Sequence, residues 1–261
     1  MSKESNVIVE HSNDGISRLK LNDSENYNSL SFNTLELLIK NLRNFNKDKN
    51  TKVIIIEGLG KGFCAGHNLR EVRYLKNKNK YNKLFNLCSK LMIEIIEGRK
   101  PVIAKVHGAA YAAGCQLVAS CDLALSSDDA KFATPGVKIG LFCSTPMVAV
   151  SRKVSRKKTM KMLLTGDSID AKYAKEIGLI NDYYPISKLE DEILKLAKKI
   201  ITKSNYTVKV GKEAFYKQLE MPIKKAYKYT SKVMANNMMA MDAKEGISAF
   251  LEKRTPKWQN K

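Results

Sequence analysis

The chain has 261 residues, of which 44% are hydrophobic, and it carries 46 Lys and Arg against 26 Asp and Glu. This length and apolar content allow one large domain, or a core with a smaller appendage, and are sufficient for an enzyme. No run reaches the roughly 18 apolar residues that a membrane-spanning helix requires, so we expect no membrane span.

The formal charge of +20 comes mostly from lysines interspersed with asparagines, as in KNKNKYNK at 76–83. A nucleic-acid-binding protein usually concentrates such charge beside stacking aromatic residues or within a known module. The sequence has neither feature, so we predict no nucleic-acid partner. The lysines are interpreted as a solvated surface, with the steering of an anionic ligand as the alternative.

The five cysteines are an odd number, and no pair has CxxC spacing. We interpret them as reduced thiols of a cytoplasmic or organelle-matrix protein. Residues 1–15, MSKESNVIVEHSNDG, lack the apolar segment of a signal peptide and contain acidic residues that are unusual in a transit peptide. We therefore expect no targeting segment in this chain.

In chain order, NVIVE at 6–10 and GISRLKLN at 15–22 are typical of a β-hairpin. Continuous apolar runs predict three further strands, which are VIIIEG at 53–58, VIAKVHG at 102–108 and DLALSS at 122–127. Helices are predicted between them, from Ser31 through SFNTLELLIKNLRNF and over LFNLCSKLMIEIIEG, which ends at Gly98. Alternating strands and helices indicate an α/β core.

Beyond residue 145 the strand patterns become scarce and the chain is predicted to be mainly helical. SKLE at 187–190 matches a capping box, which predicts that a helix begins there. The methionine-rich run VMANNMMAMDA at 233–243 is typical of a face that packs against the core or another subunit. We predict a core over residues 1–200 and a helical oligomerisation region over residues 201–261.

Two strands are followed by loops of small residues. GFCAGHNL at 62–69 follows VIIIEG, and HGAAYAAGC at 107–115 follows VIAKV. The glycine spacing of the first loop does not match a phosphate-binding loop, and an ordinary tight turn remains the alternative. Ala112, Ala113 and Gly114 are expected at a helix start, where N–H groups lack partners. One N–H from each loop could form an oxyanion hole.

Four segments together resemble the crotonase, or enoyl-CoA hydratase/isomerase, family. They are FCAGHNLREV at 63–72, KPVIAKVHGAAYAAGCQLVASCDLALSSDDAKFATPGVKIG at 100–140, LTGDSIDAKYAKEIGLI at 164–180 and ISAFLEKR at 247–254. The resemblance implies an α/β, crotonase-like (ClpP/crotonase) spiral of ββα units with a C-terminal helical assembly region. It also implies an acyl-CoA substrate or ligand, no permanently bound cofactor, and a homotrimer or a dimer of trimers.

By this resemblance, the main-chain N–H groups of His67 and Ala113 match the oxyanion hole that holds a CoA thioester carbonyl. Other positions match the CoA-binding surface, with the last two often contributed by an adjacent subunit: Asn28, Ser29, Leu30, Ala65, Leu69, Arg70, Phe250 and Lys253. Close approach of a ligand to main chain explains why the two loops carry such small side chains.

The sequence departs from the family pattern where hydratases carry two catalytic glutamates. Gln116 and Gly136 match these two positions; the amide of Gln116 does not titrate near neutrality, and Gly136 has no side chain. Some family members place an aspartate in the next loop, where Ser144 stands here, preceded by Cys143. We interpret these two residues as lining the acyl pocket, because no activating base is apparent.

The imidazole of His67 could project into the pocket as a proton-transfer group or pack away from it. A metal site is not predicted, because the histidines lack closely spaced ligand partners. Two functions remain open. The first is an enzyme of acyl-CoA or fatty-acid metabolism, a lyase or isomerase with weak or absent hydratase activity. The second is a non-catalytic acyl-CoA-binding or assembly protein.

Overall fold

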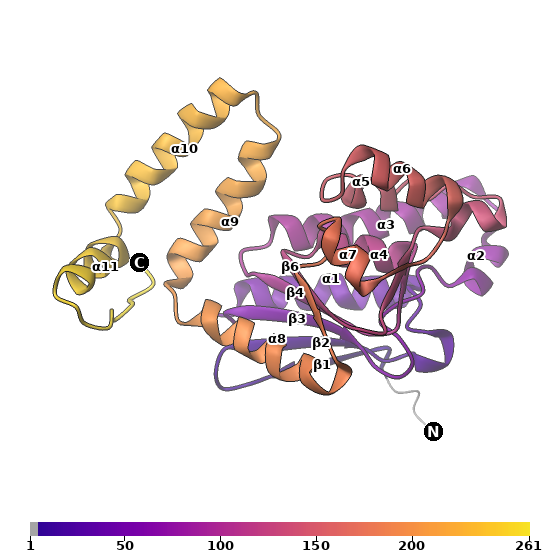
Figure 1. The fold of residues 1–261 in the computed structure, drawn as a ribbon, viewed down its shortest axis with the longest axis horizontal. Helices are drawn as coiled ribbons and strands as arrows, with labels where there is room; N and C mark the ends of the chain where they lie inside the picture. Colours follow the sequence, from indigo (N-terminus) through magenta and orange to yellow (C-terminus); the bar gives the residue numbers. More distant parts are fainter. Residues whose placement is uncertain (1–4) are drawn as a thin grey trace.

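A six-stranded sheet forms the centre of the molecule, a computed structural model that describes residues 5–261 (Figure 1). Its strand order is β1-β2-β3-β4-β6-β9; β1 and β2 are antiparallel and the other pairs are parallel. The strands are β1 Val7–His11, β2 Ile16–Leu21, β3 Val53–Gly58, β4 Val102–Val106, β6 Leu123–Ser127 and β9 Asp182–Tyr184.

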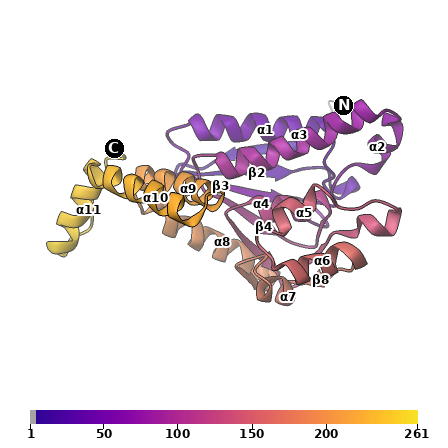
Figure 2. The same cartoon turned by 90° about the horizontal axis from the view of Figure 1, so that it is seen from above.

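Helices cover both faces of this sheet, with α1 and α3 on one side and α8 on the other (Figure 2). Successive side chains of β3 point to opposite faces of the sheet, and both sets are apolar. Ile54 and Ile56 pack towards α1 and α3, whereas Val53 and Ile55 pack towards α8. A parallel strand that is buried on both faces has a continuous apolar sequence, as VIIIEG does. The helices here are α1 Phe32–Lys47, α3 Lys78–Glu97 and α8 Ile186–Ile201.

A second sheet of three short strands, in the order β5-β7-β8, lies beside α4. Its strands are β5 Ala109–Tyr111, β7 Lys131–Ala133 and β8 Ile169–Asp170. The remaining elements before the C-terminal region are short: η1 Ser24–Asn26, α2 Leu69–Leu75, α4 Ala113–Ser120, η2 Pro135–Ile139, α5 Pro146–Val150, α6 Arg156–Thr165 and α7 Ala171–Glu176. Because β5 leads directly into α4, this small sheet positions the start of that helix.

The predicted hairpin, strands and helices are confirmed. The first predicted helix begins where expected, because the Ser31 side chain caps α1 and its Oγ accepts a hydrogen bond from the Thr34 N–H at 3.1 Å. The second predicted helix, α3, ends before Gly98 but begins earlier than expected, at Lys78. No helix within residues 5–261 is both long and apolar enough to cross a membrane.

The capping box predicted at SKLE is wrong. α8 begins at Ile186, so Ser187 lies inside the helix, and no side chain caps the helix start. Glu190 is instead directed at the sheet, where its carboxylate pairs with Arg18 and Lys105. The pattern of a capping box therefore matched a carboxylate that has a tertiary partner.

The C-terminal helices form an arm that extends away from the core (Figures 1 and 2). They are α9 Asn205–Leu219, α10 Ile223–Met238 and α11 Met241–Leu251. Many of their large apolar side chains are exposed: Phe215, Leu219, Ile223, Met234, Met238, Met239, Met241, Ile247, Phe250 and Leu251. The predicted boundary at residues 200 and 201 falls at the end of α8, immediately before the arm.

A buried lysine attaches the arm to the core. The Lys212 side chain, on α9, is only 6% exposed and pairs with Asp122 at 2.6 Å. Its ammonium group also donates to the carbonyl oxygens of Ile95 at 2.8 Å and Lys100 at 2.9 Å. The other Asp122 oxygen accepts from the Tyr216 hydroxyl at 2.9 Å. All three ammonium protons thus have partners from the core.

We predict that Lys212→Ala lowers the free energy of unfolding by about 3 kcal/mol, because it leaves Asp122 without its buried cation. Urea denaturation at one fixed protein concentration measures the change. Lys232→Ala on α10 is the control, since Lys232 is exposed and has no ion pair within residues 5–261. Equal stability of the two variants would contradict the anchoring role of Lys212.

Candidate active site

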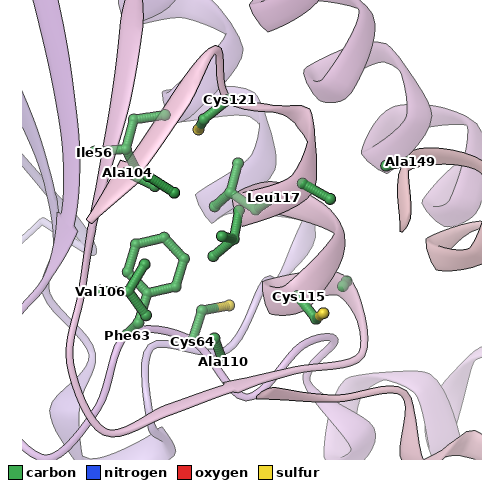
Figure 3. Close-up of a cluster of buried hydrophobic side chains, with 14 of the residues drawn as sticks. Ile56, Phe63, Cys64, Ala104, Val106, Ala110, Cys115, Leu117, Cys121 and Ala149 are labelled. Carbon is green, nitrogen blue, oxygen red and sulfur yellow. The ribbon is translucent and has the colours of Figure 1, made fainter. Parts of the chain in front are cut away.

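The two predicted loops of small residues pack directly against each other. The Cys64 N–H donates to the Ala109 carbonyl at 2.9 Å, and the Tyr111 N–H donates to the Cys64 carbonyl at 2.9 Å. Cys64 and Ala110 thereby form a parallel bridge, and Figure 3 shows the two residues beside Leu117 and Cys115 of α4. The first loop therefore behaves as an extra strand along β5.

Two glycines allow this contact to be as close as it is. A Cβ atom at Gly114 would lie 2.0 Å from the Cys64 carbonyl oxygen, and one at Gly66 would lie 3.1 Å from the Ala113 nitrogen. Gly66 also has a φ of +96°, which side chains other than glycine rarely adopt. The small side chains are therefore required by the packing of main chain on main chain.

The loops leave two N–H groups without acceptors. Ala112 enters α4 with a φ of +48° and its N–H donates to the Ala133 carbonyl at 2.9 Å, so α4 begins at Ala113. Among the hydrogen bonds of residues 5–261, none uses the N–H of Ala113 or of His67. One of these donors comes from each loop. Gly66, which directly precedes His67, packs against the Ala113 nitrogen and so brings the two donors close together. Such an arrangement can donate two hydrogen bonds to one oxygen atom.

The His67 imidazole packs inward rather than pairing with another ionisable group. Its Nδ1 lies 3.4 Å from the Leu30 carbonyl oxygen, and its ring meets the Phe85 ring edge-on with centroids 5.4 Å apart. Because a carbonyl oxygen only accepts, Nδ1 carries the proton and Nε2 is left as a buried acceptor without a partner in the described chain. Burial lowers the pKa of His67, which keeps the ring neutral at pH 7.

Gln116 lies one turn into α4 and is buried. Its Oε1 is 3.9 Å from the Cys88 thiol of α3, a weak donor. Cys88 and Phe85 lie one helical turn apart on α3, so this helix contacts both His67 and Gln116. The sequence reasoning missed these two α3 residues, and the only signal for them was the apolar spacing of the helix face.

Gly136 and Cys143 fit together in a way that leaves no space for a side chain at position 136. The Gly136 N–H donates to the Cys143 sulfur at 3.3 Å. A Cβ at Gly136 would lie 3.0 Å from that sulfur and 2.8 Å from the Leu141 carbonyl oxygen. Burial raises the pKa of the Cys143 thiol, so it is not an activated nucleophile. Ser144 is exposed and its hydroxyl donates to the Phe142 carbonyl at 3.3 Å.

Residues 28–30 hold the first loop in place through hydrogen bonds. The buried Asn28 amide donates to the carbonyl oxygens of Leu59 and Gly62, both at 2.8 Å, and Leu30 N–H donates to the Gly66 carbonyl at 2.7 Å. The Ser29 hydroxyl is buried without a partner in the described chain. The side chain of Asn28 and the main-chain N–H groups of residues 28–30 are therefore occupied within the chain, which leaves the Ser29 hydroxyl as the polar side-chain group of this segment without a partner there.

The other predicted CoA-binding residues lie at opposite ends of the molecule. Ala65, Leu69 and Arg70 are exposed around the start of α2. Phe250, which is 82% exposed, and Lys253 lie at the end of α11 in the arm. Both views separate α2 from α11 by the whole core (Figures 1 and 2), so a single chain does not bring the two groups together. Within residues 5–261, no cluster of His, Cys, Asp and Glu could hold a metal ion.

Comparisons with known proteins agree with this geometry. The sequence profile of the enoyl-CoA hydratase/isomerase family matches residues 11–261. The mitochondrial enoyl-CoA hydratase domain-containing protein 3 of Xenopus laevis is 44% identical over 244 residues, covering 94% of this chain and 83% of that protein. Its human counterpart is 43% identical over 247 residues, covering 95% and 82%.

Solved structures give the same result. A crystal structure of an enoyl-CoA hydratase from Mycobacterium smegmatis has a TM-score of 0.96 and 44% identity, covering 98% of this chain and 99% of that one. Human enoyl-CoA hydratase domain-containing protein 3 has a TM-score of 0.94 and 42% identity, covering 97% and 100%. The predicted crotonase-like fold is confirmed. The segments GHNL and GLFCSTP predict a likeness to the domain-containing protein 3 group, which is confirmed as well.

We predict that Gly114→Ala separates the two loops and destabilises the chain by more than about 2 kcal/mol, because the new Cβ overlaps the Cys64 carbonyl. Gly211→Ala is the matched control. Gly211 lies inside α9 with nothing within 4 Å of the added Cβ, so this change should stabilise by about 0.5–1 kcal/mol. Urea denaturation of both variants checks the opposite signs, and a tolerated Gly114→Ala would refute the close contact.

Proposed function

Because the chain belongs to the enoyl-CoA hydratase/isomerase family, we propose that it binds an acyl-CoA and polarises the thioester carbonyl with the N–H groups of His67 and Ala113. The observation that supports this most is that each loop contributes one N–H without an acceptor, held together by the Gly66 contact. Donors aimed at an oxygen that gains negative charge stabilise an enolate-like transition state without reorganising. The dipole of α4 adds to the effect at Ala113.

We further propose a homotrimer or a dimer of trimers. Phe250 and Lys253 cannot reach the Leu69 and Arg70 region of their own chain, and the arm exposes a long apolar surface. A second subunit that covers this surface would bring Phe250 and Lys253 onto a neighbour's CoA. The positive charge of Lys253 and Arg70 suits the phosphates of that ligand.

Of the two predicted compartments, we propose the organelle matrix. The vertebrate relatives are named as mitochondrial proteins. The five buried, unpaired cysteines are compatible with a reducing compartment.

The alternative function is non-catalytic binding of an acyl-CoA. It is favoured by the contact of Gly136 with Cys143 and Leu141, which excludes a carboxylate side chain at position 136 without movement of the loop. We propose that Gln116 and Gly136 stand where hydratases carry their two acids, so that polarisation of the thioester persists while proton transfer is weak.

The oxyanion hole is tested with Ala113→Pro and a conjugated dienoyl-CoA, whose absorbance shifts to longer wavelength when its carbonyl is polarised. Proline at the first position of α4 removes the N–H while fitting a helix start. We expect the wild type to produce the shift and the variant to lose it, corresponding to about 3 kcal/mol of lost stabilisation.

Arg156→Pro is the control for this experiment, because Arg156 is the first residue of α6 and its N–H donates no hydrogen bond within residues 5–261. Circular dichroism verifies that both variants fold. No shift in the wild type, or an undiminished shift in folded Ala113→Pro, would refute the proposed hole.

Hydration of crotonyl-CoA should be weak in the wild type, because a positioned acid or base contributes roughly 10²- to 10⁴-fold and both positions lack one. Gln116→Glu should raise the rate, whereas Gly136→Glu should destabilise the chain because its Cβ meets Leu141 and Cys143. His67→Ala tests whether the free Nε2 acceptor substitutes as the base.

A wild-type rate typical of hydratases would contradict the prediction. Tight binding of acyl-CoA thioesters without turnover of any would favour the non-catalytic alternative.

A further inference from the structure

A groove of about 610 Å³ lies between the core and the arm, and we propose that it binds a compact polyphosphate anion. Its walls are the end of α1 with the loop before β3, the segment before β4, the start of α9, and the last residues of the chain. The cationic residues that line it are Lys47, Lys49, Lys52, Arg99, Lys100, Lys209 and Lys261.

The groove is richer in basic residues than the chain as a whole. Seven of its fifteen lining residues are Lys or Arg, and Asp48 is the single acidic side chain among them. In the whole chain, 46 of 261 residues are Lys or Arg. Two other hollows within residues 5–261 contain both signs: one is lined by three basic and three acidic residues, and the other, which shares Asp48, Lys49 and Lys52 with the groove, by two basic and two acidic residues. The high lysine content alone therefore does not explain this groove.

These cations have not been neutralised by the protein. None of the seven forms an ion pair within the described chain. Burial lowers the pKa of Lys100; Asp48 opposes this shift, while the positive charges of Arg99, Lys209 and Lys52 add to it. The groups thus repel one another at close range. A bound polyanion would remove that repulsion.

The walls of the groove are held in place without the ligand. The Asn46 side chain accepts from the N–H groups of Arg99 at 2.7 Å and Lys100 at 3.1 Å, which fixes the core wall. The buried Asp242 carboxylate accepts from the N–H groups of Gln259 at 2.6 Å and Asn260 at 2.9 Å, which fixes the tail. Less ordering on binding leaves more of the attraction as affinity.

The shape favours a small polyphosphate over a nucleic-acid strand. A strand needs an extended cationic track with several stacking aromatic residues, and Tyr206 is the only aromatic residue that lines this groove. A di- or triphosphate concentrates several negative charges in a volume that fits within the groove. Inorganic polyphosphate and the phosphates of a nucleotide share this chemistry.

The groove is separate from the candidate active site. Lys52 and Pro101 stand just before β3 and β4, whereas the small-residue loops follow the opposite ends of these strands. The six residues of β3 place the two regions about 20 Å apart. Because the groove contains residues of the core and of α9, a bound anion would also hold the arm against the core.

Calorimetric titration with inorganic tripolyphosphate at about 0.15 M ionic strength tests the proposal. The groove variant is Lys49→Ala with Arg99→Ala and Lys209→Ala. The matched variant is Lys157→Ala with Lys161→Ala and Lys172→Ala, which removes the same charge from α6 and α7, where these lysines are exposed and unpaired in the described chain. We expect saturable binding of one anion per chain, weakened at least about tenfold in the groove variant and under about threefold in the matched variant.

Equal weakening in both variants would show diffuse attraction to a basic surface and would overturn the proposal, as would the absence of saturable binding. Tripolyphosphate should also raise the melting temperature of the wild type and the matched variant but not of the groove variant. If the groove variant does not fold, Lys49→Gln with Arg99→Gln takes its place, and Lys157→Gln with Lys161→Gln is then the matched variant. Comparable affinities for pyrophosphate and ADP would identify free phosphate as the ligand, and tighter ADP binding would identify a nucleotide. An oligonucleotide that binds more tightly than tripolyphosphate, with equal losses in both variants, would overturn the proposal.

Discussion

The contact of Gly114 with the Cys64 carbonyl oxygen sets the geometry on which the candidate active site depends. A Cβ atom at Gly114 would lie 2.0 Å from that oxygen, far inside the contact distance of real side chains. The N–H of Ala113 precedes this contact by one residue, and the N–H of His67 follows Cys64 by three. The spacing of these donors is thus set by main chain packed against main chain, while the His67 imidazole is turned inward against Phe85.

This constraint explains why so much of the fold and the site could be predicted from sequence. Periodic apolar runs specify buried strands and amphipathic helices locally, and Ser31 specifies a helix start within one turn. The close main-chain contact can also be anticipated from sequence, because it requires glycine at positions such as Gly114. The failure at SKLE has a tertiary cause, because Glu190 is held by Arg18 and Lys105 from two distant strands. A local motif cannot reveal that its carboxylate has partners from distant parts of the chain.

The positions of individual side chains in the site were less predictable for the same reason. Asn28 matched a ligand-binding position, yet its amide holds the carbonyl oxygens of Leu59 and Gly62. Gly136 suggested a missing acid, but only the structure places the Cys143 sulfur where a side chain would go. Placing a carboxylate side chain at position 136 therefore requires a change in the loop of residues 141–143 as well. The substitution and the loop are coupled, and one position cannot be altered alone.

The arm is anchored to the core through α9, yet it exposes many apolar side chains. The buried ammonium group of Lys212, with all three protons bound to core acceptors, fixes the first arm helix in one orientation. Beyond that point α10 packs mainly against α9 and α11, so the core does not cover its apolar side chains. A single chain thus anchors the arm through α9 and leaves the apolar surface of the arm in water. Anchoring α9 would lower the ordering cost of the assembly proposed above, and the same helix contributes residues to the cationic groove.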